Sequence, residues 1–252
     1  MPQIPPLILF SRMFGDLDLQ TLFITILVLS VSLSFHEFAH AWMANRLGDP
    51  TAAEAGRLTM NPLKHLDPIG SLVFLLTRRI GWARPVPVNP NRFDRKHTIK
   101  KGMMLTSLAG PVSNFILGAV SIIVLKIAEI ISALTDTQNT QMFLLIFNMM
   151  FMFYAANMLL GLFNLLPVPP LDGYKVFGAA LPRDLYFRVM RYERYIGMVF
   201  LLLIFFGGGI LGRILTVLRV PFDLVIATPI NWLFNLLRDA IGLNSSIISM
   251  FF

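Results

Sequence analysis

The chain has 252 residues, of which 56% are hydrophobic and only 14% are charged. An average soluble domain carries about 25% charged residues, so this chain has too little polar surface to cover a globule in water. The composition excludes a disordered chain and a cytosolic enzyme, and the absence of cysteine excludes disulfides and thiolate metal sites. It indicates an integral membrane protein.

Four stretches with few charges are long enough to be membrane spans, because a bilayer core needs about 20 helical residues. In chain order they cover about residues 19–45, 102–126, 140–166 and 195–212. A further stretch at 220–242 contains Pro229 and only 14 consecutive uncharged residues, Leu224–Leu237, so it is either interfacial or an additional span. The sequence predicts an all-α polytopic membrane protein that forms a single domain over residues 1–252.

Along the chain, connections between spans that are rich in Lys and Arg alternate with a connection that is poor in them. Segment 46–101 holds eleven Lys and Arg against four acidic residues, the connection around 126–141 has one Lys, and 172–194 holds five basic residues. The positive-inside rule then places 46–101 and 172–194 in the cytoplasm and the N-terminus outside, in the plasma (inner) membrane. No removable signal peptide is expected. Since the basic residues lie between apolar runs rather than on a basic domain, no nucleic-acid partner is expected.

Segment 46–101 is punctuated by prolines, with apolar stretches such as Leu72–Thr77 between them. This pattern does not favour a spanning helix. It favours a small membrane-associated β-hairpin or loop region, which is tolerated at membrane depth only against protein or a water-filled cavity.

The chemistry is concentrated in His36-Glu37-Phe38-Ala39-His40, at the cytoplasmic end of the first span. Residues i and i+4 of a helix share one face, so both imidazoles can bind one metal ion. Glu37 is then placed to take a proton from a water molecule in the open position of a tetrahedral zinc site. Three ionisable groups within five residues of a span favour a functional interpretation over a packing one.

Two histidines require a third ligand, for which His65, His97 and Asp172 are candidates. The first and third spans run in the same direction, so Asp172 arrives on the same side as the two histidines. His40 and His36 lie ~8 and ~14 Å below Asn45 at 1.5 Å per residue, and the extended stretch before Asp172 can reach that depth. Asp172 could instead cap the following helix; the shared depth favours a ligand.

The chain resembles the site-2 protease family of intramembrane zinc metalloproteases, in its compact form without PDZ or CBS domains. His36–His40 is similar to the metal-binding helix, Asn164–Gly173 to the second signature, and Ala109-Gly110-Pro111 with Asn114 to the short motif of the middle core helix. The resemblance implies a three-helix catalytic core, followed here by one or two C-terminal membrane helices. It implies one Zn²⁺ bound by His36, His40 and Asp172, with Glu37 as catalytic base.

Three further residues are candidates for contact with substrate or the transition state. Asn164 and Asn114 have amides suited to a substrate backbone or an oxyanion, or alternatively to hydrogen bonds between helices. Pro170 is expected to set the extended geometry before Asp172. Asn157 is interpreted as structural, and Gly110 as a close-packing position.

These features predict a membrane-embedded zinc metalloendopeptidase that cleaves transmembrane substrate segments near the cytoplasmic side of the bilayer. Its partners would be a transmembrane protein substrate and membrane lipids, with a strand edge in 56–93 pairing with the unwound substrate. The alternatives are a non-proteolytic metal-binding scaffold or pseudoprotease, and a zinc transporter. Other divalent ions also suit two imidazoles and a carboxylate.

Overall fold

The computed structural model describes residues 19–77, 81–137, 140–206 and 209–242. Four long helices dominate this part of the chain: α2 (Leu19–Arg46), α5 (Ile99–Thr135), α6 (Gln141–Asn164) and α10 (Ile210–Ala240). All four are long and apolar enough to cross a membrane. Large apolar side chains such as Phe23 and Val225 lie exposed on them, as contact with lipid requires. The prediction of an all-α polytopic membrane protein is confirmed.

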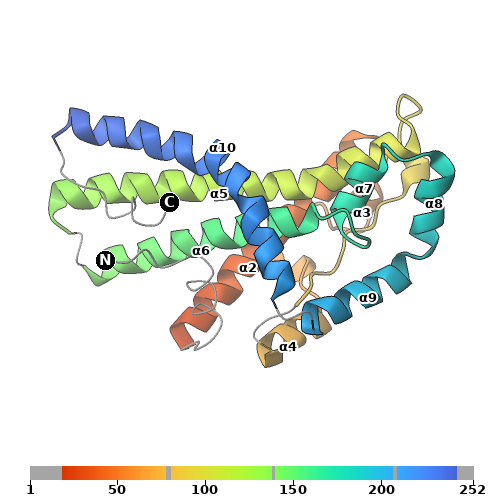
Figure 1. The fold of residues 1–252 in the computed structure, drawn as a ribbon, viewed down its shortest axis with the longest axis horizontal. Coiled ribbons are helices and arrows are strands. Elements are labelled where there is room, and N and C mark those ends of the chain that lie inside the picture. Colours follow the sequence, from red (N-terminus) through yellow and green to blue (C-terminus); the bar gives the residue numbers. More distant parts are fainter. Residues whose placement is uncertain (1–18, 78–80, 138–139, 207–208, 243–252) are drawn as a thin grey trace.

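Helices α2, α5 and α6 form the expected three-helix core, in which each helix contacts the other two. In Figure 1, α5 and α6 run antiparallel along the molecule, and α10 crosses them. Ile122 of α5, Tyr154 and Met158 of α6 and Ala227 of α10 make one buried apolar cluster. Gly118 of α5 faces the same cluster, and a Cβ there would be in ordinary van der Waals contact with Met158 Sδ at 3.4 Å.

Helix α5 continues well beyond Lys126, where the charge pattern had predicted the end of the second span. Lys126 and Glu129 are 1% and 4% exposed, and Lys126 Nζ lies 3.4 Å from Glu129 Oε2. Paired charges inside a bundle are much less costly than single charges facing lipid. The helix therefore ends only at Thr135, where Asp136 adopts the left-handed conformation with φ 52°.

Of the two forms expected for segment 46–101, a β-hairpin or a loop region, its described residues form loops interrupted by short helices. These are α3 (Thr51–Glu54), η1 (Pro62–Lys64), α4 (Pro68–Thr77) and η2 (Pro90–Arg92). Proline occupies the first position of the last three, where its missing N–H is not needed and its fixed φ favours a helical start. Within the described residues, pairing of β type is limited to one antiparallel bridge between Leu66 and Ala83.

The C-terminal region also differs from the expected pattern of spans. After α7 (Asp172–Gly178) and α8 (Arg183–Arg191), α9 (Glu193–Phe206) has 14 residues, too few to cross a bilayer. The stretch expected to be one span, 195–212, therefore includes most of α9 up to Phe206 and the start of α10, which follows Gly209 at φ 81°. Segment 220–242, which had been left open as interfacial or spanning, lies almost entirely within long α10.

Ion pairing explains why α10 is longer than its sequence suggests. Arg219 Nε lies 2.8 Å from Asp223 Oδ2, and Tyr154 of α6 donates its hydroxyl to the same carboxylate. These contacts neutralise Asp223, the charge that had marked the N-terminal limit of the 14-residue apolar stretch. The two prolines inside α10, Pro221 and Pro229, remove individual hydrogen bonds without ending the helix.

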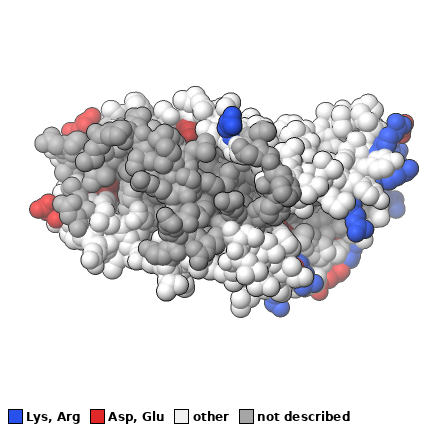
Figure 2. Space-filling model, turned by 60° about the horizontal axis from the view of Figure 1, so that its bottom comes forward, with Lys and Arg blue, Asp and Glu red and all other residues white. Residues whose placement is uncertain are grey.

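Charge is distributed unevenly along the long axis of the molecule. Figure 2 shows Lys and Arg gathered at the end where α7 and α8 lie, while Asp and Glu mark the opposite end. The exposed arginines of α8 and of the first turn of α9 contribute to the basic end: Arg183, Arg188, Arg191 and Arg194.

Candidate metal centre

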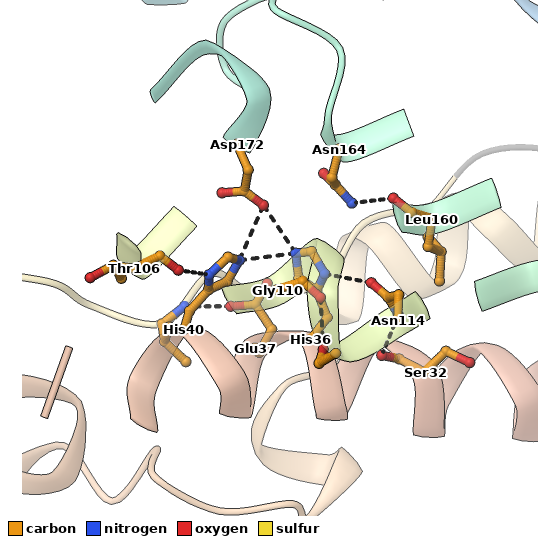
Figure 3. A network of polar contacts seen from close by, with 12 residues as sticks. Ser32, His36, Glu37, His40, Thr106, Gly110, Asn114, Leu160, Asn164 and Asp172 are labelled. Carbon is orange, nitrogen blue, oxygen red and sulfur yellow. Dashed lines mark hydrogen bonds and ion pairs between the residues drawn. The ribbon is translucent and has the colours of Figure 1, made fainter. Parts of the chain in front are cut away.

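Three side chains from two distant parts of the chain converge at the basic half of the core. His36 Nε2 and His40 Nε2 lie 3.0 Å apart, and each lies 3.2 Å from Asp172 Oδ2 (Figure 3). Both histidines are buried within α2, at 5% and 8% exposure. Among the described residues, these three form the one group of His, Asp and Glu side chains able to hold a metal ion.

Asp172 reaches this point because the chain turns sharply after α6. Helix α6 ends at Asn164, and α7 begins with Asp172 itself. Gly173 permits the turn, because a Cβ there would lie 2.2 Å from the carbonyl oxygen of Leu165. The cap of α7 is Leu171, so the carboxylate of Asp172 is not engaged as a helix cap and instead faces the imidazoles.

The backbone of α5 fixes the tautomer of His40. Its Nδ1 lies 2.7 Å from the carbonyl oxygen of Thr106, which can only accept a hydrogen bond. Nδ1 must therefore carry the proton, and Nε2 is left with a lone pair. The imidazole is consequently presented in the form that binds metals.

A chain of amides fixes His36 in the same way. Asn157 donates its amide N–H groups to the carbonyl of Phe153 at 2.8 Å and to Ser32 Oγ at 2.9 Å, so its oxygen is the acceptor for Asn114 Nδ2 at 2.9 Å. Asn114 then presents its own oxygen to His36 Nδ1 at 2.7 Å. The proton lies on Nδ1, and Nε2 again has a lone pair.

The donor set fits a divalent cation. Two imidazole lone pairs and a carboxylate oxygen that face one another at 3.0–3.2 Å repel, unless a proton or a cation lies among them. A divalent cation removes this repulsion, and two imidazole nitrogens with one carboxylate oxygen suit zinc with one position open.

Gly110 of α5 provides the space behind the two rings. A Cβ at this position would lie 2.4 Å from His40 Cε1 and 2.6 Å from His36 Cε1. The sequence had suggested close helix packing at Gly110; the structure adds that the close contact is with the imidazoles themselves.

Glu37 is buried at 8% exposure, next to the imidazoles in Figure 3 and close enough for its charge to act on His40. The backbone N–H of Val86, from segment 46–101, donates to Glu37 Oε2 at 2.8 Å. Sequence reasoning had not found Val86. The sequence did contain a signal: in Pro85-Val86-Pro87 only Val86 has a backbone N–H, so it is the one main-chain donor of these three residues.

The other candidates take different places. Asn114 is fully buried, and its two amide N–H groups point to Asn157 and the carbonyl of Ser32, so it orients His36 and offers no donor to a substrate. Asn164 donates to the Leu160 carbonyl at 3.0 Å and lies on the Asp172 side of the imidazoles (Figure 3). Pro170 is exposed and lines a cavity of about 640 Å³ against α9.

His65 takes no part in this cluster. It is 1% exposed, and its Nε2 lies 2.7 Å from the carbonyl of Thr59. His97, the other alternative ligand, is likewise outside the cluster.

The expectation of a free strand edge in 56–93 is wrong for the stretch that passes the site. The N–H of Arg84 donates to the His65 carbonyl at 2.7 Å, and that of Val86 donates to Glu37. Asn89 donates its N–H to Asp49 Oδ2 at 2.6 Å, and Pro85 and Pro87 have no N–H. The main-chain N–H groups of Arg84, Val86 and Asn89 are therefore already engaged within the protein.

Together, the fold and the cluster define a membrane-embedded metal site of the hydrolytic type. The chain matches the model of peptidase family M50 over residues 24–204. It is 40% identical over 183 residues to "Putative zinc metalloprotease YwhC" of Bacillus subtilis, an alignment that covers 71% of this chain and 78% of the relative. It is 30% identical over 201 residues to the similarly named Rip2 of Mycobacterium tuberculosis, covering 77% and 71%. No solved structure matches.

The chain therefore belongs to peptidase family M50, the site-2 protease family. It is a membrane metalloprotease that uses zinc.

Proposed function

We propose that this protein hydrolyses peptide bonds within transmembrane segments of its substrates, near the cytoplasmic side of the bilayer. The observation that carries the proposal is the convergence of His36 Nε2, His40 Nε2 and Asp172 Oδ2 beside a buried glutamate, inside a bundle of membrane-spanning helices.

In this proposal His36, His40 and Asp172 bind one zinc ion, and Glu37 is the catalytic base. When bound, zinc supplies a Lewis acid that polarises the scissile carbonyl and acidifies a neighbouring water molecule. Glu37 takes a proton from water with the carboxylate oxygen not held by Val86, and then donates a proton to the leaving amine. Asn114 keeps His36 in its metal-binding tautomer.

The cytoplasmic position of the site is supported by charge and depth. The basic end of the molecule contains α3, α7 and α8, which belong to the segments expected in the cytoplasm, 46–101 and 172–194. His40 and His36 lie six and ten residues before Arg46, the last residue of α2, which corresponds to ~9 and ~15 Å along the helix. The scissile bond would then lie within the cytoplasmic half of the bilayer.

A substrate segment must be unwound before its peptide bond can reach the site. A cavity of about 640 Å³ lies between Pro170, two residues before Asp172 in the chain, and α9. We place the unwound segment there, with Pro170 and Asn164 as contacts. Exposed apolar residues of η1 and α4, such as Leu63, Ile69 and Leu76, would contact the lipids around it.

The test is cleavage of a panel of single-span membrane proteins in liposomes, with product mass spectrometry to locate the cut. Glu37→Gln should bind zinc as the parent does and lose cleavage by about 10²-fold or more, the usual loss on removing a general base. Glu54→Gln, the same change at an exposed carboxylate, should cleave normally. Cleavage by Glu37→Gln at the parental rate would refute the mechanism.

The same assay separates the alternatives. A scaffold or pseudoprotease would load zinc and bind substrate helices without any cleavage by the parent protein. A transporter would move zinc into the liposomes, which an internal zinc-sensitive dye detects.

A further inference from the structure

The contact between Val86 and Glu37 is made by the one main-chain donor available at that point. Val86 lies between Pro85 and Pro87, and proline has no N–H. The N–H of Val86 nevertheless donates to Glu37 Oε2 at 2.8 Å, in a buried environment. One carboxylate oxygen of the proposed base is thereby held, which leaves the other to accept a proton.

The conformation of this segment is restricted by its sequence. A residue that precedes proline is disfavoured in the helical region, so Arg84 and Val86 are both biased towards extended backbone. The side chain of Val86 is 9% exposed and packs against Ala41 of α2 and Ala52 of α3. Backbone restriction and packing together determine the direction in which its N–H points.

Arg57 attaches the segment to the rest of the protein immediately before Val86. Its Nη1 donates to the Pro85 carbonyl at 3.1 Å, and its Nη2 donates to the Arg84 carbonyl at 2.6 Å. The planar guanidinium can hold two neighbouring carbonyls at once, which the single ammonium of lysine does less well. Arg57 thus fixes both peptide groups that lead to the Val86 N–H.

Burying the Arg57 guanidinium is energetically unfavourable, so its position calls for an explanation. The residue is 8% exposed, and its hydrogen bonds within the described chain go to carbonyls rather than to a carboxylate. Burial and the neighbouring Arg84 lower the pKa of Arg57, while the charge of Glu37 raises it. A buried cation with uncharged partners is unfavourable, and the carboxylate that favours it is that of the proposed base.

We infer that Arg57 is a positioning residue for Glu37. Through the carbonyls of Arg84 and Pro85 it holds the Val86 N–H on Glu37 Oε2 and so sets the orientation of the carboxylate. This inference rests on the proposed role of Glu37 as base. Arg57 itself touches neither the metal cluster nor a substrate.

The test compares Arg57→Met and Arg57→Lys with the parent protein, using the full chain in liposomes and a cleavable transmembrane substrate. Arg57→Met should lower kcat about 10- to 100-fold, the scale expected when a catalytic group is misplaced. KM and zinc content should stay unchanged. Arg57→Lys should recover part of the rate, and Arg95→Met, at an exposed arginine of the same segment, should cleave normally.

Hydrogen exchange supplies a readout that does not depend on activity. Peptides covering 84–88 contain few exchangeable amides, because two of the five residues are proline. In Arg57→Met the amide of Val86 should exchange at least about tenfold faster than in the parent, since exchange tracks local opening. Val86→Pro, which removes the same N–H without changing Arg57, should reproduce the loss of kcat.

Several results would overturn the inference. Unchanged kcat in Arg57→Met, or unchanged exchange at Val86, would show that Arg57 does not act on Glu37. A higher kcat would show that the segment obstructs the site rather than orienting the base. If Arg57→Met lost zinc or failed to fold, Arg57→Lys and Val86→Pro would decide, and normal kcat in both would refute the inference. If the parent showed no cleavage dependent on Glu37, the proposed function would fail, while exchange at Val86 would still test the contact made by Arg57.

Discussion

Gly110 lies so close to His40 that a Cβ at position 110 would be 2.4 Å from Cε1 of the imidazole. Both rings therefore rest on the bare backbone of α5. The same surface supplies the Thr106 carbonyl and the Asn114 amide that fix their tautomers. Helix α5 thus positions both histidines of α2 through direct contacts with their rings.

Gly110→Ala is expected to displace both imidazoles and to weaken zinc binding by at least about tenfold. The control is Gly118→Ala on the same helix, where the new Cβ would be in ordinary contact with Met158 Sδ at 3.4 Å. Zinc content and competition with a chelator measure the effect. Parental zinc affinity in Gly110→Ala would contradict the close contact.

The amide chain predicts a graded series. Asn114→Ala removes the acceptor for His36 Nδ1 and should lower zinc affinity about 10- to 100-fold, the usual effect of losing a partner of a metal ligand. Asn157→Ala, one step further away, should have a smaller effect. Asn91→Ala, at an exposed position, should have none. Equal zinc affinity across the series, measured by chelator competition, would show that the tautomer of His36 is set in another way.

Asp172→Asn tests the third ligand. It keeps the size of the side chain and removes its charge, so zinc affinity should fall more than the about 10- to 100-fold expected for an outer partner. His97→Gln, at the alternative candidate outside the cluster, should bind zinc as the parent does. The opposite pattern would assign the third ligand to His97.

The Arg219–Asp223 pair should hold α10 against α6. Asp223→Leu leaves Arg219 without its carboxylate and removes the acceptor for the Tyr154 hydroxyl, so it should destabilise the protein by about 2 kcal/mol. The double change Arg219→Leu with Asp223→Leu should be less harmful, since it leaves no unpaired charge. Denaturant unfolding in micelles measures both, and a double variant as unstable as the single one would contradict the pairing.

Local sequence patterns were enough to predict the class of fold and the part of the candidate site that lies on α2. The helical spacing of His36 and His40 places two imidazoles on one face whatever the rest of the chain does. Apolar runs located the three core helices, because the requirement for about 20 apolar residues applies to each helix separately. Where charges are paired across or within helices, as at Lys126 and Asp223, the same patterns ended the helix too early or missed it.

Only the tertiary structure decided which groups hold these side chains in place, because the contacts join residues far apart in the chain. His36 and Asn114 are 78 positions apart in the chain, and Glu37 and Val86 are 49 positions apart, so no local pattern indicates either contact. The turn at Gly173 that brings Asp172 to the imidazoles, and the bare surface of Gly110 beneath them, likewise depend on how α5 and α6 pack against α2. The periodicity of a single helix reports which face is apolar; it does not report which neighbour that face meets.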